Sequence, residues 1–342
     1  MGTPPSQPPQ VPKALENVQA AGQGATPVIG EVPADLRTAE RTPEFIDLPR
    51  GKELNDLAAL DLAKSRSVQW IVLAGPVDSG KTTLLTSLYE LFQWRKVEGY
   101  AFAGSNTLPA FEERCYLSRR DSGNVLPHTP RTTYKGPDPQ YLHLRIRPTA
   151  GLRSFRDFLF TDVSGEMFEH ARDSTTECKE MTFLKRANHL LLFLDSAKGI
   201  QQDKRWAMIE DGRALLRSCV DSAMIPVNCV VNVVWSRFDY FAAKEADDGH
   251  RIFRADAERE LRKTFDQLIP RLMFSEIAAR PLETTALHFG HGVPALLKQW
   301  AATSLEMKAP DLFPSSYLGA RESELFAVRH FSSTTANEES NA

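Results

Sequence analysis

The chain has 342 residues, of which 42% are hydrophobic and 25% are charged, and its formal net charge is −3. This length and apolar content are sufficient for one large hydrophobic core or two smaller ones. Lysine and arginine are dispersed among the acids, and no long basic stripe is present. This pattern argues against a dedicated nucleic-acid-binding protein, so no nucleic-acid partner is expected.

The cysteines and the apolar runs bear on the compartment. The four cysteines are too scattered for a disulfide framework, and no two of them form a C-x-x-C pair. No apolar run approaches the roughly 18 residues that a membrane span requires, and the polar N-terminus has no signal-peptide core. The sequence therefore predicts a cytoplasmic protein with reduced thiols and no transmembrane segment.

The two ends of the chain differ in composition from its middle. Residues 1–42 are rich in proline and poor in aromatic residues, which predicts a disordered N-terminal tail. Residues 43–67 regain apolar residues at helical spacing and predict a short helical lead-in that docks on the domain. Residues 68–305 are expected to form one domain. Proline, serine, threonine and glutamate return in residues 306–342, which we expect to be a largely disordered C-terminal tail.

The stretch GPVDSGKTT at residues 75–83 matches the phosphate-binding pattern G-x-x-x-x-G-K-[ST]. A buried-strand run at 68–74 precedes it, and residues 83–92 follow with helical spacing. Such a loop wraps its backbone N–H groups around a triphosphate. The lysine reaches the β- and γ-phosphates, and the following hydroxyl binds Mg²⁺. The expected nucleotide contacts are Gly75, Asp78, Ser79, Gly80, Lys81, Thr82 and Thr83, with Lys81 also catalytic and Thr82 also a metal ligand.

A connection at 95–140 follows, which is too long for an ordinary loop and contains a helical patch at 109–120. Strand patterns at 141–147 and 155–161 then predict a hairpin. A hydroxyl at 128–134 is expected to complete the metal shell when a γ-phosphate is present. Thr132 is the first choice as this metal ligand, and Thr133 is nearly equal. Arg131 beside them is a candidate internal arginine finger, outside the core set of site residues.

Asp162 lies where the second hairpin strand ends, and it opens a D-x-x-G pattern that closes at Gly165. A carboxylate at this place holds Mg²⁺ through water, and the glycine lets a backbone N–H approach the γ-phosphate. We therefore expect Asp162 in the metal site and Gly165 in the nucleotide site.

Strands and helices alternate in the rest of the domain, which predicts βα winding on a mostly parallel sheet. Strands are expected at 189–195, 225–235 and 277–285, and helices at 203–222, 252–268 and 293–302.

The segment Ser236-Arg237-Phe238-Asp239 is similar to the Asn/Thr-Lys-x-Asp signature of GTPases. In that signature the aspartate accepts two hydrogen bonds from the guanine edge, a pair of donors that adenine does not offer. Arg237 replaces the lysine and Ser236 replaces asparagine or threonine. The motif therefore favours guanine and leaves adenine open, with Arg237 and Asp239 as base-side contacts.

Taken in order, these pieces resemble the TRAFAC branch of P-loop GTPases and, more closely, the bacterial double-GTPase family. The motifs that carry the closer resemblance are GPVDSGKTTLLTSLYELF, FAGSNTLPAFEER, TPRTT, YLHLRI, DVSGE and ANHLLLFLD. The resemblance implies an α/β, Ras-like P-loop GTPase fold. It also implies a mostly parallel sheet with one antiparallel hairpin strand, helices on both faces, and a long insertion in the switch I region.

The resemblance further implies that Asp162 and Gly165 belong to a γ-phosphate switch and that Asp239 binds the base. Its implied partners are GTP, a second GTPase and GTPase-associated proteins in predicted bacterial conflict systems. One position departs from small GTPases, which place glutamine after D-x-x-G to orient water, whereas this chain has Glu166. A carboxylate near a γ-phosphate is repelled. Glu166 is therefore either a catalytic water-orienting residue or turned away from the nucleotide.

The sequence-based hypothesis is a Mg²⁺-dependent GTPase, slow without a partner, that uses GTP as substrate and acts as a nucleotide-controlled switch. Two alternatives stay open. One is a GTP-binding assembly module with little intrinsic hydrolysis, and the other is a P-loop ATPase or small-molecule kinase.

Overall fold

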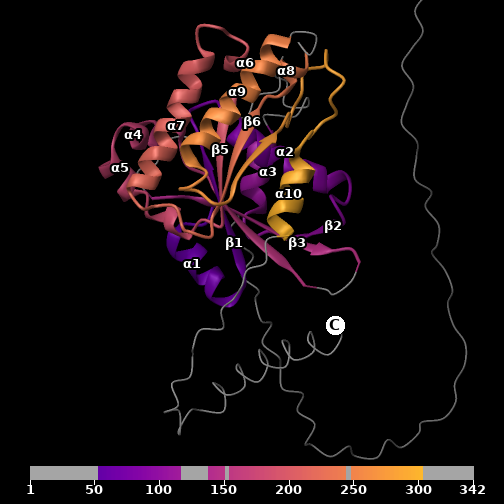
Figure 1. The fold of residues 1–342 in the computed structure, drawn as a ribbon. Coiled ribbons are helices and arrows are strands. Elements are labelled where there is room, and N and C mark those ends of the chain that lie inside the picture. Colours follow the sequence, from indigo (N-terminus) through magenta and orange to yellow (C-terminus); the bar gives the residue numbers. More distant parts are fainter. Residues whose placement is uncertain (1–52, 117–137, 151–153, 244–247, 303–342) are drawn as a thin grey trace, which may run out of the picture. The chain divides into compact units, whose positions relative to one another are not determined.

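The computed structural model describes residues 53–116, 138–150, 154–243 and 248–302 (Figure 1). The predicted tails at 1–42 and 306–342 and the start of the lead-in at 43–52 lie outside these ranges. So do the segment 128–134 and with it Arg131, Thr132 and Thr133.

The described chain is built on one sheet in the order β2-β3-β4-β1-β5-β6-β7. In this sheet β3 runs antiparallel to both of its neighbours, and the remaining pairs are parallel. The predicted mostly parallel α/β sheet with one antiparallel hairpin strand is confirmed. The strands are β1 Val68–Ala74, β2 Tyr100–Gly104, β3 Tyr141–Pro148, β4 Arg156–Thr161, β5 His189–Asp195, β6 Val230–Ser236 and β7 Leu272–Glu276.

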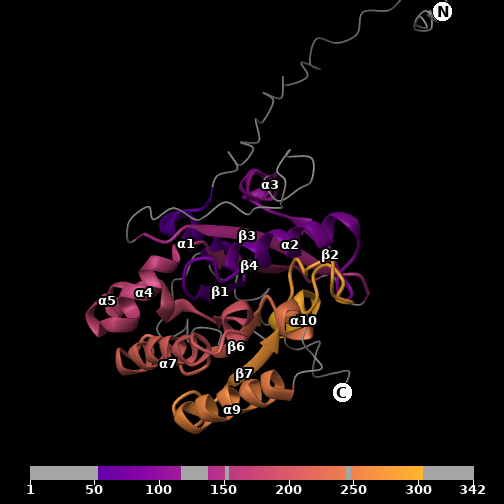
Figure 2. The ribbon, with the colours of Figure 1, turned by 90° about the horizontal axis from the view of Figure 1, so that it is seen from above.

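Helices cover both faces of this sheet, as predicted, and Figure 2 shows the two layers from above. None of the described helices is long and apolar enough to cross a membrane. The α-helices are α1 Asp56–Ser65, α2 Lys81–Trp94, α3 Leu108–Tyr116, α4 Gly165–Asp173, α5 Thr175–Glu180, α6 Ser196–Gly199, α7 Arg205–Asp221, α8 Asp239–Ala242, α9 Asp248–Phe265 and α10 Val293–Ala302, and a 3₁₀ helix spans Thr182–Arg186.

Two hydrophobic cores lie on opposite faces of the sheet because successive side chains of a strand point to opposite sides. In β1, Val72 and Ala74 join the core formed with α1, α4, α7 and α9. Ile71 and Leu73 join the core formed with α2, α3 and α10. A strand covered on both faces has a continuous apolar sequence. This explains why the ranges predicted from the sequence for β1 and β5 agree with the observed ones.

The last strand was predicted wrongly. It was expected at 277–285, whereas β7 spans Leu272–Glu276. Its register with β6 ends at the pair Trp235 and Glu276. Pro281, which has no N–H to donate, stands within the expected range. Ile277 and Ala279 are nevertheless buried, because the irregular segment after β7 packs into the core beside α10.

The edge strand β2 was not predicted, because its residues were assigned to the long connection. Its sequence YAFAG has two alanines and one glycine in five residues, so it carries little of the β-branched signal by which strands are recognised. It pairs antiparallel with β3, with an irregularity between Phe102 and Gly104. The predicted helical patch at 109–120 corresponds to α3, which begins at Leu108.

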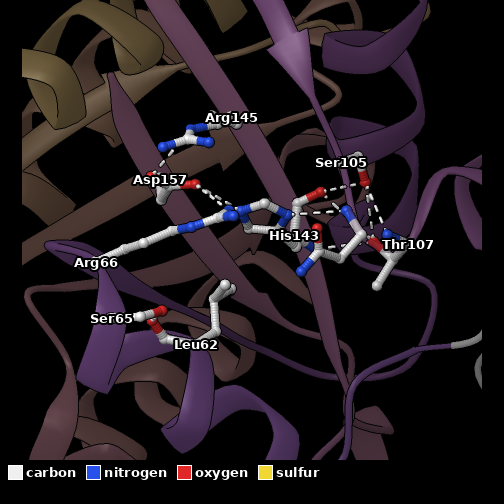
Figure 3. A network of polar contacts seen from close by, with 9 residues as sticks. Leu62, Ser65, Arg66, Ser105, Thr107, His143, Arg145 and Asp157 are labelled. Carbon is white, nitrogen blue, oxygen red and sulfur yellow. Dashed lines mark hydrogen bonds and ion pairs between the residues drawn. The ribbon is translucent and has the colours of Figure 1, made fainter. Parts of the chain in front are cut away.

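A buried polar network fixes the turn between β2 and α3 (Figure 3). His143 of β3 accepts a hydrogen bond at Nδ1 from the Asn106 N–H at 2.9 Å, so the ring proton lies on Nε2, which donates to Asp157 at 2.9 Å. Ser105 Oγ donates to the His143 carbonyl at 2.5 Å. The Thr107 hydroxyl accepts from the His143 N–H at 2.9 Å. The start of α3 is therefore attached to the interior of the sheet.

The segment between β7 and α10 depends on one glycine. Gly292 has φ +77°, and a Cβ there would lie 2.0 Å from the Glu276 carbonyl oxygen. Gly99 has the same φ, but a Cβ there would have no heavy atom within 4 Å. Substitutions at Gly99 and Gly292 therefore differ in steric crowding but not in φ, so comparing them isolates the cost of crowding.

We expect Gly99→Ala to lower the free energy of unfolding by about 1–2 kcal/mol, the cost of a left-handed alanine. Gly292→Ala should lower it by several kcal/mol more, because the backbone around Glu276 must also move. Urea unfolding of both variants measures the difference. Equal losses would show that the contact with Glu276 is relieved at no cost.

Candidate functional site

The predicted site residues within the described ranges lie at one edge of the sheet. Gly75, Asp78, Ser79 and Gly80 form the loop between β1 and α2, and Lys81, Thr82 and Thr83 form the first turn of α2. Asp162 follows β4, Gly165 and Glu166 begin α4, and Arg237 and Asp239 follow β6. The carboxyl ends of parallel strands meet at such an edge, where ligands bind in open α/β sheets.

The phosphate-loop sequence forms a strand, a tight loop and a helix, as expected. Gly80 is the N-cap of α2 with φ +92°, a conformation that other residues adopt only with strain. The N-terminus of α2 therefore adjoins the loop directly, and the N–H groups at a helix N-terminus favour an anion. This arrangement is suited to an anionic ligand.

Lys81 lies folded back on the loop in this structure. Its Nζ donates to the carbonyl oxygens of Gly75 at 2.8 Å and Pro76 at 2.7 Å. Burial lowers the pKa of Lys81 to about 8, and the nearby carboxylates of Asp162, Glu169 and Asp78 oppose this decrease. The ammonium therefore lies among acidic groups at the mouth of the loop.

Asp162 is buried and forms an ion pair with Arg114 of α3. The same guanidinium donates to Glu53 at 2.5 Å and to the Ala110 carbonyl at 2.8 Å. Arg114 was not singled out from the sequence, because nothing in its local pattern distinguishes it from a solvated helix residue.

The start of α4 lies directly against the phosphate loop. A Cβ on Gly165 would be 2.3 Å from the backbone nitrogen of Val77, so only glycine permits this approach. Ser164 caps the helix, accepting from the Glu166 N–H at 3.4 Å. One turn further on, Glu169 accepts from the Val77 N–H at 3.3 Å. A loop amide is thus bound by a carboxylate of the chain itself.

Asp239 is buried, with 2% of its surface exposed. One carboxylate oxygen accepts from the Leu282 N–H at 3.1 Å, and the other finds no hydrogen-bond partner among the described residues. Burial raises the pKa of this carboxyl, and the Leu282 N–H opposes the increase. Since buried polar atoms are normally paired, the orphaned oxygen indicates a place for a donor from a ligand.

Arg237 joins the base-side segment to the phosphate loop. Its guanidinium donates to the Asp78 carbonyl at 3.2 Å and pairs with Asp195 at the end of β5. Asp195 also caps α6 by accepting from the Ala197 N–H at 3.0 Å. Arg237 and Asp78 both have positive φ, which non-glycine residues adopt at a cost and which often marks functional sites.

The oxygen atoms at this edge are of the kind that can act as ligands of Mg²⁺. Thr82 and Asp162 offer hydroxyl and carboxylate oxygens, the ligands that this hard cation prefers. Within the described ranges, no group of three or more His, Cys, Asp or Glu side chains is placed to hold a metal. Any ion bound here would thus depend on phosphate and water oxygens for the rest of its shell, as is usual for Mg²⁺ with nucleotides.

Four contributors were missed by sequence reasoning: Arg114, Glu169, Asp195 and the Leu282 backbone. Asp195 had a usable signal, since it ends a buried strand in the same way as Asp162. The other three had none, because their places depend on how α3, α4 and the segment after β7 pack.

The model of the double-GTPase 2 family matches residues 69–301. Among solved structures, the crystal structure of the bacterial selenocysteine-specific elongation factor EF-Sec is similar, with 14% identity and a TM-score of 0.30. The similarity covers 68% of this chain, which spans 28% of the length of that protein. A comparison with curated proteins gives no match.

We expect Asp239→Asn to stabilise the nucleotide-free protein at neutral pH, because it removes a buried charge. The folded-state pKa of Asp239 is raised, so the cost of ionising it is complete above that pKa and disappears as the pH falls below the unfolded value. The melting temperature should rise by about 2 °C or more at pH 7.5. This gain should shrink toward pH 4.

The matched control is Asp173→Asn. Asp173 is exposed and pairs with Arg172, which lowers its pKa, so its replacement should give no such gain. An Asp239→Asn protein that is no more stable than wild type at pH 7.5 would contradict the assigned cost of the buried carboxylate.

Proposed function

This chain belongs to the double-GTPase 2 family, and from that membership we propose that it is a Mg²⁺-dependent GTPase that acts as a nucleotide-controlled switch. It has the P-loop GTPase fold and is a GTP-binding protein. The observation that carries the proposal is the buried carboxylate of Asp239, at the sheet edge that bears the phosphate loop, because one of its oxygens has no hydrogen-bond partner among the described residues.

Asp239 supports guanine as the base. The guanine edge offers two N–H donors, a ring imide and an exocyclic amine, which a carboxylate can accept together. Adenine offers no such pair, so it would leave the buried oxygen unpaired, at a cost of about 1–3 kcal/mol. The Leu282 N–H already holds the other oxygen and thereby fixes the orientation of the carboxylate.

The phosphate end divides the roles among residues of the loop and of β4. Thr82 and Asp162 would hold Mg²⁺, and the ion would neutralise negative charge on the phosphates. Thr132 or Thr133 would add a hydroxyl. Lys81 would leave the carbonyls of Gly75 and Pro76 for the phosphate oxygens, where a cation stabilises developing negative charge.

The contact between α4 and the loop supports a switch. Gly165 lies against Val77, and Glu169 accepts from the Val77 N–H. A γ-phosphate that uses this amide must displace the carboxylate, so the triphosphate and α4 compete for one donor. Binding of GTP would therefore change the position or the order of the start of α4.

Glu166 is the residue on which hydrolysis depends in this proposal. It lies in the first turn of α4, next to the glycine that contacts the loop. From there it would orient or deprotonate the attacking water, and Lys81 would stabilise the charge on the phosphate. Intrinsic hydrolysis would be slow, on the order of 10⁻⁴ to 10⁻² per second.

A second candidate is a GTP-binding assembly module with little hydrolysis. The specific observation in its favour is that Glu169 of α4 accepts from the Val77 N–H of the phosphate loop, where negative charge opposes attack on the phosphate, and Glu166 adds a second acidic residue in the first turn of the same helix. In either case we propose a second GTPase and GTPase-associated proteins as partners, in a bacterial conflict system in the cytoplasm. A P-loop ATPase is the third hypothesis, and the carboxylate of Asp239 on the base side disfavours it.

We expect the wild type to bind GTP at least about tenfold more tightly than ATP, the factor for roughly 1.4 kcal/mol. Asp239→Asn should weaken GTP and strengthen XTP, because an amide donates where xanthine presents an acceptor. Fluorescence competition against a labelled GTP analogue measures the three affinities. Lys81→Ala is the control that should lose all three nucleotides, and equal binding of ATP and GTP by the wild type would favour the ATPase reading.

We expect Glu166→Ala to slow hydrolysis strongly while GTP affinity stays near the wild-type value, as for an interaction made only in the transition state. Glu166→Gln tests whether a neutral water-orienting group is sufficient. Single-turnover hydrolysis of pre-bound GTP gives the rates. If both variants hydrolyse GTP at the wild-type rate, Glu166 has no catalytic role.

A further inference from the structure

The ion pair between Arg114 and Asp162 brings a residue of α3 to the carboxylate that we propose for Mg²⁺. Both side chains are almost completely buried, with 11% and 5% of their surface exposed. The guanidinium also donates to Glu53 at 2.5 Å and to the Ala110 carbonyl at 2.8 Å. One cation is thus shared by two carboxylates and a carbonyl.

The helix that carries Arg114, α3, is held in place at its start and at its middle. Its start is attached to β3 through the contacts of Ser105, Asn106 and Thr107 with His143 (Figure 3). Its middle packs on α2, where Phe111 stacks on Tyr89 with ring centroids 5.1 Å apart. The Tyr89 hydroxyl donates to Glu112 at 2.5 Å.

The same carboxylate is therefore within reach of two cations of different origin. A carboxylate oxygen that accepts a guanidinium N–H has less capacity to hold a metal or its bound water, and two positive charges on one buried group repel each other. Arginine and Mg²⁺ must then compete for Asp162, or the arginine must move when the ion binds.

We propose that Arg114 is an internal counter-ion that takes the place of Mg²⁺ on Asp162, so that binding of the metal with nucleotide releases Arg114 and loosens α3. The proposal rests on the assignment of Asp162 to the metal site. It makes α3, which leads into residues 117–137, the element that reports whether the metal is bound. In the absence of the ion, Arg114 also neutralises a carboxylate that would otherwise be buried with less compensation.

A purely structural role makes a different prediction. If Arg114 only joins Glu53 to the domain, its removal lowers stability and leaves the metal dependence of nucleotide binding unchanged. If it holds Asp162 in position for the metal, its removal weakens Mg²⁺. Only competition makes the ion bind more tightly.

The test measures the Mg²⁺ concentration that gives half of the maximal affinity for a fluorescent GTP analogue. Arg114→Met should lower this concentration at least about tenfold, because Mg²⁺ no longer has to displace a charge-assisted contact on Asp162. Arg114→Lys, which keeps the charge, should stay closer to wild type. Arg254→Met is the matched control, since it removes an arginine that pairs with Glu276 at 2.7 Å on another part of the sheet. An unchanged or higher value for Arg114→Met overturns the proposal.

Hydrogen exchange of residues 108–116 gives a second readout that does not depend on hydrolysis. In the wild type, exchange should be slow in chelator and faster with Mg²⁺ and GTP, whereas in Arg114→Met it should be fast in both conditions. A wild type that binds GTP with Mg²⁺ but shows no change in α3 overturns this inference and leaves the GTPase proposal standing.

A wild type that binds no nucleotide would instead overturn the proposed function. Exchange of α3 with Mg²⁺ alone at millimolar concentration then decides the inference. An increase in the wild type that is absent from Arg114→Met supports competition for Asp162, and no difference between the two proteins overturns it.

Discussion

The constraint on which the structure depends is the burial of the parallel strands β4, β1, β5 and β6 on both faces. Their side chains contribute to both cores at once, so these strands form the centre of the sheet, and their carboxyl ends meet at one edge. Asp195 ends β5, Asp162 and Asp239 follow β4 and β6, and the three carboxylates thus lie at this edge. The loop after β1 lies among them because β1 is central in the sheet.

The charges at that edge are balanced by the chain itself. Arg114 pairs with Asp162, Arg237 pairs with Asp195, and Lys81 lies among three carboxylates. Glu169 binds an amide of the phosphate loop. Arg114 thus places a positive charge where we propose that Mg²⁺ binds, and Glu169 places a negative charge where we propose that a phosphate binds. Ligand binding would then be an exchange of ion pairs rather than the filling of an uncharged pocket.

The two halves of the site differ in this respect. Around the phosphate loop, Lys81, Asp162 and the Val77 amide all have partners within the chain. On the base side, one oxygen of Asp239 has no hydrogen-bond partner among the described residues, and burial raises the pKa of this carboxyl although the Leu282 N–H partly offsets the increase. Buried groups with perturbed pKa values are typical of functional sites. The base side is thus the more direct indication of a ligand, and the phosphate side is the part suited to switching.

The sequence by itself determined the elements whose signal is local. The loop at 75–83, the strands β1 and β5 and the helix α10 follow from glycine placement, continuous apolar runs and helical spacing, and the structure has them where they were predicted. Local signals failed for β2, which is a short edge strand of small residues, and for β7, where a proline interrupts the expected range. Both lie at the margins of the sheet, where pairing with a neighbour decides the conformation more than composition does.

Only the tertiary structure decided which side chains share the site. The contacts of Arg114 with Asp162, of Glu169 with Val77 and of Leu282 with Asp239 join residues 48, 92 and 43 positions apart. Nothing in a local pattern encodes such a contact, because it depends on the packing of α3, α4 and the segment after β7 against the sheet. The sequence identified the residues that follow the buried strands, and the fold determined the charges that meet them.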